Sequence, residues 1–306
     1  ALRQAGLQAK GATLYVTLEP CAHQGRTPPC VDAVIASGVK RVVVAMKDPF
    51  PKVRGRSIKK MIAAGINVQV GCLEHRARAI NPGFCKWAIE GIPLVTVKTA
   101  QTLDGKTATA TGQSKWITSA KTRAHTRQLR DQFDAILVGV NTVLKDDPML
   151  NPALTAKPWT KIVLDSWLRV PPHAKLFENF QTVVATTSKA PLTRITQLEK
   201  KGARVIVCPA DGNGRVRWDS LLESLGKCGI TNLLIEGGAK VIGSALKARA
   251  ADRIITIVSP KIIGDQRAQS CVDGLNISNV NRAVQVDGMT ARQVGGDWIF
   301  EGKIRY

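Results

Sequence analysis

The segment from Leu233 to Ser244, LLIEGGAKVIGS, constrains the fold of this chain more than any other stretch. An apolar run typical of a buried strand ends in Glu236, turns through Gly237 and Gly238, and continues into a helical pattern. The glycines permit positive φ angles and close backbone approach, and the helix start offers unpaired N–H groups to a phosphate. Glu236 then lies at the carboxyl end of a strand, where α/β sheets bind ligands. The same residues also fit a plain strand-to-helix turn, so this segment alone leaves both interpretations open.

The length of 306 residues predicts two domains. Apolar runs alternate with helical stretches on both sides of Gly91-Ile92-Pro93, which predicts an α/β fold in each half. We place the boundary so that one domain covers residues 1–92 and the other residues 93–306. Within these halves, the spacing predicts one helix from Glu74 to Ile89 and a short final strand from Trp298 to Phe300.

The charge and the cysteine content limit which binding partners and which cellular compartment fit this chain. The net charge of +21 suits a polyanion, but the basic residues are spread along the chain and do not alternate with aromatic residues. A phosphorylated small molecule is therefore favoured over nucleic acid. The seven scattered cysteines are not a disulfide framework, which indicates the cytoplasm. No apolar run is long enough to span a bilayer, so we expect no membrane partner.

Two cysteines occur in a context that suggests metal chemistry. A predicted strand over residues 11–19 ends just before Cys21, and Cys30 opens a predicted helix. Thiolates are good ligands for Zn²⁺, and a helix N-terminus lowers the pKa of a thiol. Zinc-dependent base deaminases hold two of their three protein ligands in this way, and an upstream His-x-Glu segment supplies their proton shuttle.

Three segments resemble the deaminase domain of the bifunctional riboflavin-biosynthesis deaminase–reductase family: TLEPCAHQGRTPPC (17–30), DPFPKVRGR (48–56) and NPGF (81–84). The resemblance implies a cytidine-deaminase-like αβα domain in which Cys21 and Cys30 bind zinc. The family's His-Ala-Glu segment would fall upstream of Ala1, so we expect this domain to be partial and unable to deaminate as given. A truncated sequence and a natural paralogue that has lost deamination both fit, and the missing Met with intact cysteines favours truncation.

From Pro93 onward, the chain resembles the reductase half of the same family. The segments VKTAQTLDGKTAT, SKWITS, LVGVNTVLKDDP, IVLDS and LLIEGGAKVIGSAL follow in the family's order. The resemblance implies a dihydrofolate-reductase-like α/β domain and NADPH as cofactor. The implied substrate is a phosphoribosylaminouracil, whose ribosyl group is reduced to ribityl. No Gly-x-Gly-x-x-Gly follows a strand, so a Rossmann cofactor site is not indicated. We expect the protein to form a homo-oligomer.

The resemblance also assigns site residues. Lys98 would assist protonation of an imine, and Glu236 would hydrogen-bond the pyrimidine or sugar. Substrate positions fall on Ser114, Arg130, Leu150 and Glu236, and the guanidinium fork of Arg130 suits the sugar phosphate. Cofactor positions fall on Ala100, Trp116, Thr142, Asp146 and Ser166, and on the pyrophosphate-binding turn Gly238, Ala239, Lys240, Val241, Ile242, Gly243 and Ser244.

One departure affects the substrate phosphate. The family often has an Arg shortly after Asp-Asp-Pro-x-Leu, but residues 149–154 read MLNPAL, which leaves Lys157 or Lys161 as substitutes. The sequence singles out no residue for the 2′-phosphate that distinguishes NADPH from NADH. Two other functions stay open: a reductase-only homologue whose first domain is a scaffold, and a basic nucleic-acid-binding protein.

Overall fold

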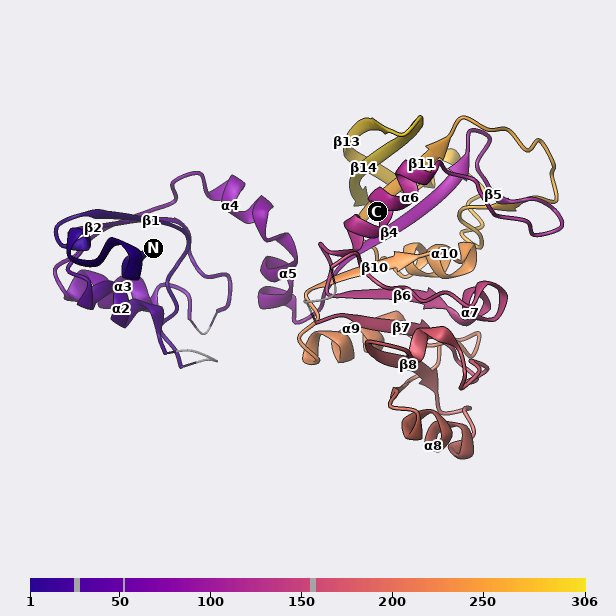
Figure 1. Ribbon diagram of the computed structural model, residues 1–306, viewed down its shortest axis with the longest axis horizontal. Helices are drawn as coiled ribbons and strands as arrows, with labels where there is room; N and C mark the ends of the chain where they lie inside the picture. The colour runs from indigo at the N-terminus through magenta and orange to yellow at the C-terminus, as the bar shows by residue number, and fades with distance from the viewer. Residues whose placement is uncertain (25–27, 52, 155–157) are drawn as a thin grey trace. The chain divides into compact units, whose positions relative to one another are not determined.

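The computed structural model describes residues 1–24, 28–51, 53–154 and 158–306. The chain divides into two compact units, Ala1–Gly91 and Ile92–Tyr306, which Figure 1 shows with their helices and strands. No helix in the described residues combines the length and apolar character needed to cross a bilayer.

The first unit is built on a three-stranded parallel sheet in the order β1-β2-β3. Its elements are α1 (Leu2–Ala5), η1 (Gly6–Ala9), β1 (Thr13–Leu18), α2 (Cys30–Ala36), β2 (Arg41–Met46), α3 (Arg56–Ala63), β3 (Asn67–Val70), α4 (Glu74–Ile80) and α5 (Pro82–Glu90). Val31 of α2 and Met61 of α3 pack on Val42 and Val44 of the central strand, and all four are fully buried. The apolar spacing of the two helices and the continuous run of β2 therefore meet in one core.

The predicted single helix from Glu74 to Ile89 is wrong, because α4 ends at Ile80 and α5 begins at Pro82. Asn81 lies between them with φ −127° and ψ 55°, outside the helical region. Proline has no N–H to continue the helix, and its ring disfavours a helical conformation in the preceding residue. At the first position of α5, neither property has a cost.

The second unit contains a nine-stranded mixed sheet in the order β13-β14-β11-β4-β10-β6-β7-β8-β9. Its strands are β4 (Leu94–Thr102), β6 (Ala135–Gly139), β7 (Thr160–Leu164), β8 (Gln181–Thr187), β9 (Arg204–Cys208), β10 (Asn232–Glu236), β11 (Arg253–Ser259), β13 (Gln285–Val294) and β14 (Asp297–Arg305). From β11 to β9, every pairing is parallel, whereas β14 and β13 add an antiparallel edge. The carboxyl ends of the parallel strands therefore meet at one edge.

Helices cover both faces of this sheet. They are α6 (Ala120–Arg130), α7 (Val140–Asp146), α8 (Leu192–Lys200), α9 (Trp218–Lys227) and α10 (Ala239–Lys247), with short turns η2 (Lys175–Phe177) and η3 (Val280–Arg282). Leu233 of β10 packs with Leu221 of α9, while its neighbour Leu234 packs with Leu129 of α6 in a separate cluster. Successive strand residues point to opposite faces, so the run LLI of β10 belongs to both cores.

The short strand predicted at Trp298–Phe300 lies within the much longer β14, which pairs with β13 as an antiparallel hairpin. A small separate sheet joins β5 (Lys106–Ala108) to β12 (Gln269–Ser270). Most of β13 is exposed and lies at the edge of the sheet, so its sequence has no apolar pattern that would have predicted it.

Candidate functional site

The turn between β10 and α10 is shaped by glycine. Gly237 and Gly238 have φ of 74° and 76°, a conformation that residues with a side chain rarely adopt. A Cβ on Gly139, at the end of β6, would lie 2.7 Å from Val241 Cγ2. The neighbouring strand end therefore also needs glycine for α10 to begin where it does. As in any α-helix, the first N–H groups of α10 have no partner within the helix, and they lie at this edge of the sheet.

Three charged side chains meet just before this turn. Glu236 accepts hydrogen bonds from Arg130 Nε and Nη2 at 3.0 and 2.9 Å, and Lys98 Nζ lies 3.9 Å from Glu236 Oε2. The parallel register pairs Glu236 directly with Lys98, whereas Arg130 comes from the last turn of α6. All three side chains are at most 17% exposed.

Burial and charge act in opposite directions on Glu236. Burial alone raises its pKa, but the positive charges of Lys98 and Arg130 outweigh burial and lower the pKa to about 2. Burial likewise lowers the pKa of Arg130, and Glu236 more than reverses this effect. Glu236 is therefore a carboxylate at neutral pH, so it accepts hydrogen bonds and has no proton to donate.

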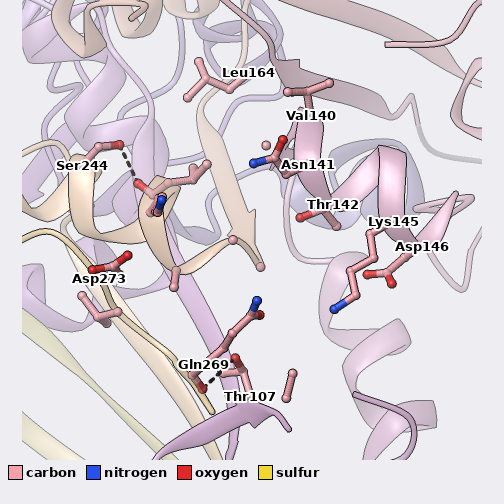
Figure 2. A pocket seen from close by; sticks show the side chains of 18 of the residues that line it. Thr107, Val140, Asn141, Thr142, Lys145, Asp146, Leu164, Ser244, Gln269 and Asp273 are labelled. Carbon is pink, nitrogen blue, oxygen red and sulfur yellow. Dashed lines mark hydrogen bonds between the residues drawn. The ribbon is translucent and has the colours of Figure 1, made fainter. Parts of the chain in front are cut away.

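Two adjoining cavities flank the turn. The smaller one, of about 260 Å³, is lined by the cluster of Lys98, Arg130 and Glu236. The larger one, of about 740 Å³, extends between α7 and α10. Figure 2 shows this cavity, with Thr142, Lys145 and Asp146 on one side of it and Ser244 on the other. Thr142 and the two glycines of the turn line both cavities, which therefore share a wall.

The cavities bring together most residues that the sequence assigned to the site. The smaller cavity is lined by Lys98, Ala100, Arg130, Thr142, Leu150, Glu236, Gly238, Ala239 and Ile242. The larger cavity is lined by Ser114, Thr142, Asp146, Ser166, Gly238, Ala239, Lys240, Val241 and Ser244. Their individual roles stay predictions.

Two predicted cofactor residues lie outside both linings. Trp116 is 62% exposed, and the guanidinium carbon of Arg123 lies 4.1 Å above its ring. Gly243 is buried in α10, where an added Cβ would lie 1.8 Å from the carbonyl oxygen of Asp273. The glycine therefore permits close packing of the segment after β12 on this helix.

Lys161, one of the two suggested phosphate-binding lysines, does not join the cluster. Lys161 is fully buried on β7, and its Nζ donates to the carbonyl oxygen of Glu178 at 2.8 Å. Lys157 lies outside the described residues, as does part of the segment between Cys21 and Cys30. Arg130 Nη1 donates to the carbonyl oxygen of Asn151 at 2.8 Å, so the loop that lacks the expected Arg instead holds Arg130.

Several lining residues were missed by the sequence analysis. Asn141, Trp167, Arg169 and Arg215 line the larger cavity, and Cys271 lines the smaller one. The two arginines belong to irregular connections without a recognisable motif. Only the chain fold brings these connections to one wall.

Cys21 and Cys30 of the first unit lie side by side, because the backbone N–H of Cys30 donates to Cys21 Sγ at 3.2 Å. Just before Cys21, the buried carboxylate of Glu19 accepts hydrogen bonds from the N–H groups of Asp48 and Gly55. The two thiols fit two positions of a tetrahedral zinc site. No group of three His, Cys, Asp or Glu side chains suited to a metal occurs within the described part of the chain.

Comparison with known families identifies both units. The model of the RibD C-terminal domain matches residues 93–300, about two thirds of the chain. The chain belongs to the RibD family. The model of the cytidine and deoxycytidylate deaminase zinc-binding region matches residues 1–46, so the RibD deaminase region is present in part.

Named RibD proteins are similar to this chain along nearly its whole length. Riboflavin biosynthesis protein RibD of Aquifex aeolicus is 42% identical over 301 residues, which are 98% of this chain and 82% of that protein. A solved structure of Acinetobacter baumannii RibD matches with a TM-score of 0.87 and 33% identity, covering 100% of this chain and 84% of that one.

A second solved structure, from Thermotoga maritima, matches with a TM-score of 0.81 and 32% identity over 100% of this chain and 84% of that one. It is named a diaminohydroxyphosphoribosylaminopyrimidine deaminase/5-amino-6-(5-phosphoribosylamino)uracil reductase. The predicted α/β fold, a deaminase-like unit followed by a RibD reductase unit, is confirmed. The chain is an enzyme of riboflavin biosynthesis.

Proposed function

We propose that the second unit reduces the ribosyl group of 5-amino-6-(5-phosphoribosylamino)uracil to ribityl with NADPH. The observation that carries this proposal is the cluster of Lys98, Arg130 and Glu236 in a cavity that adjoins the larger one. The Thermotoga maritima relative, whose name includes this reductase activity, supports the same substrate.

The larger cavity fits a dinucleotide. Its volume of about 740 Å³ lies within the range of small-molecule sites. The N-terminus of the nine-residue helix α10 follows two glycines of positive φ, a combination that suits the pyrophosphate. Bound NADPH would supply a hydride to the sugar C1′, and the protein would supply orientation and charge.

We assign the proton transfer and the binding of the substrate to three side chains of the protein. Because Glu236 is ionised, we assign proton donation during opening of the glycosylamine to the ammonium group of Lys98. Glu236 orients Lys98 and accepts hydrogen bonds from the substrate. Arg130 holds Glu236 through two hydrogen bonds, and it reaches the sugar phosphate only if it exchanges a carboxylate oxygen for a phosphate oxygen.

The test is NADPH consumption by the purified protein with and without the phosphoribosylaminouracil. We expect NADPH oxidation only with this substrate, and a product that is heavier by two hydrogens in mass spectrometry. Binding of NADPH without any substrate-dependent oxidation would contradict the proposed reaction.

For the first unit, we propose a part in zinc-dependent pyrimidine deamination, which the deaminase model and the name of the Thermotoga maritima relative support. Cys21 and Cys30 would hold two ligand positions of the zinc, which would activate a water molecule for attack on the pyrimidine. The homo-oligomeric state and the cytoplasmic location stay predictions.

A further inference from the structure

The connection after β7 and the connection before α9 form one wall of the larger cavity, and each of them contributes an arginine. Arg169 follows β7, and Arg215 precedes α9. Both are exposed, yet both line the cavity. Trp167, which is 45% exposed, lines the same cavity and precedes Arg169 by two residues.

The turn that carries Arg169 is fixed by a buried carboxylate. Asp165 is fully buried, and its Oδ2 accepts a hydrogen bond from the N–H of Val170 at 2.7 Å. Burial raises the pKa of Asp165, and the backbone hydrogen bonds of the turn together with the charge of Arg169 only partly oppose this rise. Leu168 N also donates to the Asp165 carbonyl oxygen at 3.2 Å. Both the side chain and the backbone carbonyl of Asp165 therefore accept hydrogen bonds that close the turn.

The second arginine is tied to the same turn. The N–H of Val216 donates to Ser166 Oγ at 3.2 Å, which joins the segment of Arg215 to the turn of Arg169. The N–H of Arg215 itself donates to Asp211 Oδ1 at 2.8 Å. Two connections about fifty residues apart in the sequence are therefore held together at one wall.

Among the residues that the structure describes, no ion pair neutralises the positive charge of this wall. Arg169 Nη2 donates to Asn141 Oδ1 at 2.8 Å, which is a neutral partner. Within the described residues, neither Arg169 nor Arg215 has a carboxylate within 4.0 Å. The described acidic residues that line the cavity are Asp146 of α7 and Asp273, and both belong to other segments.

We propose that Arg169 and Arg215 bind the 2′-phosphate of NADPH and so make this enzyme prefer NADPH to NADH, with the adenine against Trp167. With the pyrophosphate at α10 and the nicotinamide toward Glu236, this wall is left for the adenosine end. A phosphate dianion matches the hydrogen-bonding fork of a guanidinium group. This inference rests on the proposed function.

The experiment measures dissociation constants of NADPH and NADH for the full chain by calorimetry, without substrate. We expect Arg169→Ala and Arg215→Ala each to weaken NADPH binding by roughly tenfold or more, as for loss of a charge-assisted hydrogen bond. NADH binding should change by less than about threefold, because NADH lacks the phosphate. The matched control is Arg204→Ala, an exposed arginine of β9 that lines neither cavity.

The NADPH preference of each variant should also fall as salt concentration rises, but less steeply than that of the unaltered protein. Equal losses of NADPH and NADH, or no loss in either variant, would overturn this inference. Reduction of the aminouracil would then still stand. Failure of the unaltered protein to bind either dinucleotide would overturn both the inference and the proposed function.

Discussion

Glu236, Lys98 and Arg130 come from β10, β4 and α6, yet they form one buried cluster. The β4–β10 register places Lys98 beside Glu236, and the length of α6 brings Arg130 from the other side. Two cations around one carboxylate leave one net positive charge, which favours an anionic substrate. The chemistry of the site therefore depends on how these charges are arranged as well as on residue type.

The first prediction concerns this cluster. Glu236→Gln and Lys98→Ala should each lower aminouracil reduction by roughly a hundredfold or more, the scale of acid–base catalysis. NADPH binding should change by less than about threefold, because the variants leave the α10 turn intact. Single-turnover NADPH oxidation and NADPH titration measure the two effects. Glu199→Gln, at an exposed position of α8, is the control, and unchanged turnover in both variants would refute the assignment.

The second prediction concerns Lys161, which is fully buried on β7. Burial lowers its pKa from 10.5 to about 8, so its ammonium form destabilises the folded state. This cost is fully present below the folded pKa and disappears as the pH rises past the unfolded pKa. We expect Lys161→Met to raise the free energy of unfolding by up to about 3 kcal/mol at neutral pH.

Urea unfolding of both proteins at neutral pH and near pH 10.5 tests this prediction. The difference in unfolding free energy should shrink toward the higher pH, since lysine is then neutral in both states. Lys200→Met, at an exposed position at the end of α8, should show no such pH dependence. A constant difference for Lys161→Met would exclude a buried ammonium group.

At the scale of elements, buried parallel strands were predictable because they form continuous apolar runs. Residues 41–46 and 233–235 show this, and both lie in strands. The break before Pro82 and the exposed strand β13 were not predicted, since the first interrupts a helical pattern and the second lacks an apolar one. The strand-to-helix pattern indicated Glu236 and the resemblance supplied Lys98, but their contact depends on the register of two strands that are distant in the sequence.

The third prediction concerns the packing of α10. Gly243→Ala places a methyl group 1.8 Å from the Asp273 carbonyl oxygen, so the helix or the facing segment must move. We expect a loss of about 1–3 kcal/mol in unfolding free energy and weaker NADPH binding. Gly212→Ala, where no atom lies within 4 Å of the added Cβ, is the matched control. Equal thermal unfolding of both variants would contradict this account.

At the scale of the whole molecule, each unit has its own core. One cluster belongs entirely to residues before Gly91, and the other two to residues after it. Within the described residues, each unit is therefore packed around its own apolar side chains. The basic charge of +21 extends over both halves.

The fourth prediction follows from this separation. Cys21→Ser in the full chain should lower bound zinc, measured by mass spectrometry of metals after dialysis, because it removes one of two adjacent thiols. NADPH-dependent reduction should stay within about twofold, as expected for independent sites. Cys228→Ser, at an exposed cysteine of the second unit, should change neither value. A parallel loss of zinc and reduction after Cys21→Ser would show that the units depend on each other.

The position of β4 within the sheet has a consequence for biosynthesis. Both of its neighbours, β10 and β11, begin only at Asn232 and Arg253. A growing polypeptide on the ribosome must therefore carry Val95 and Val97, which end up fully buried, without their two neighbouring strands until most of the chain has emerged. A premature stop codon before these late strands would leave an aggregation-prone nascent product in place of a smaller working enzyme.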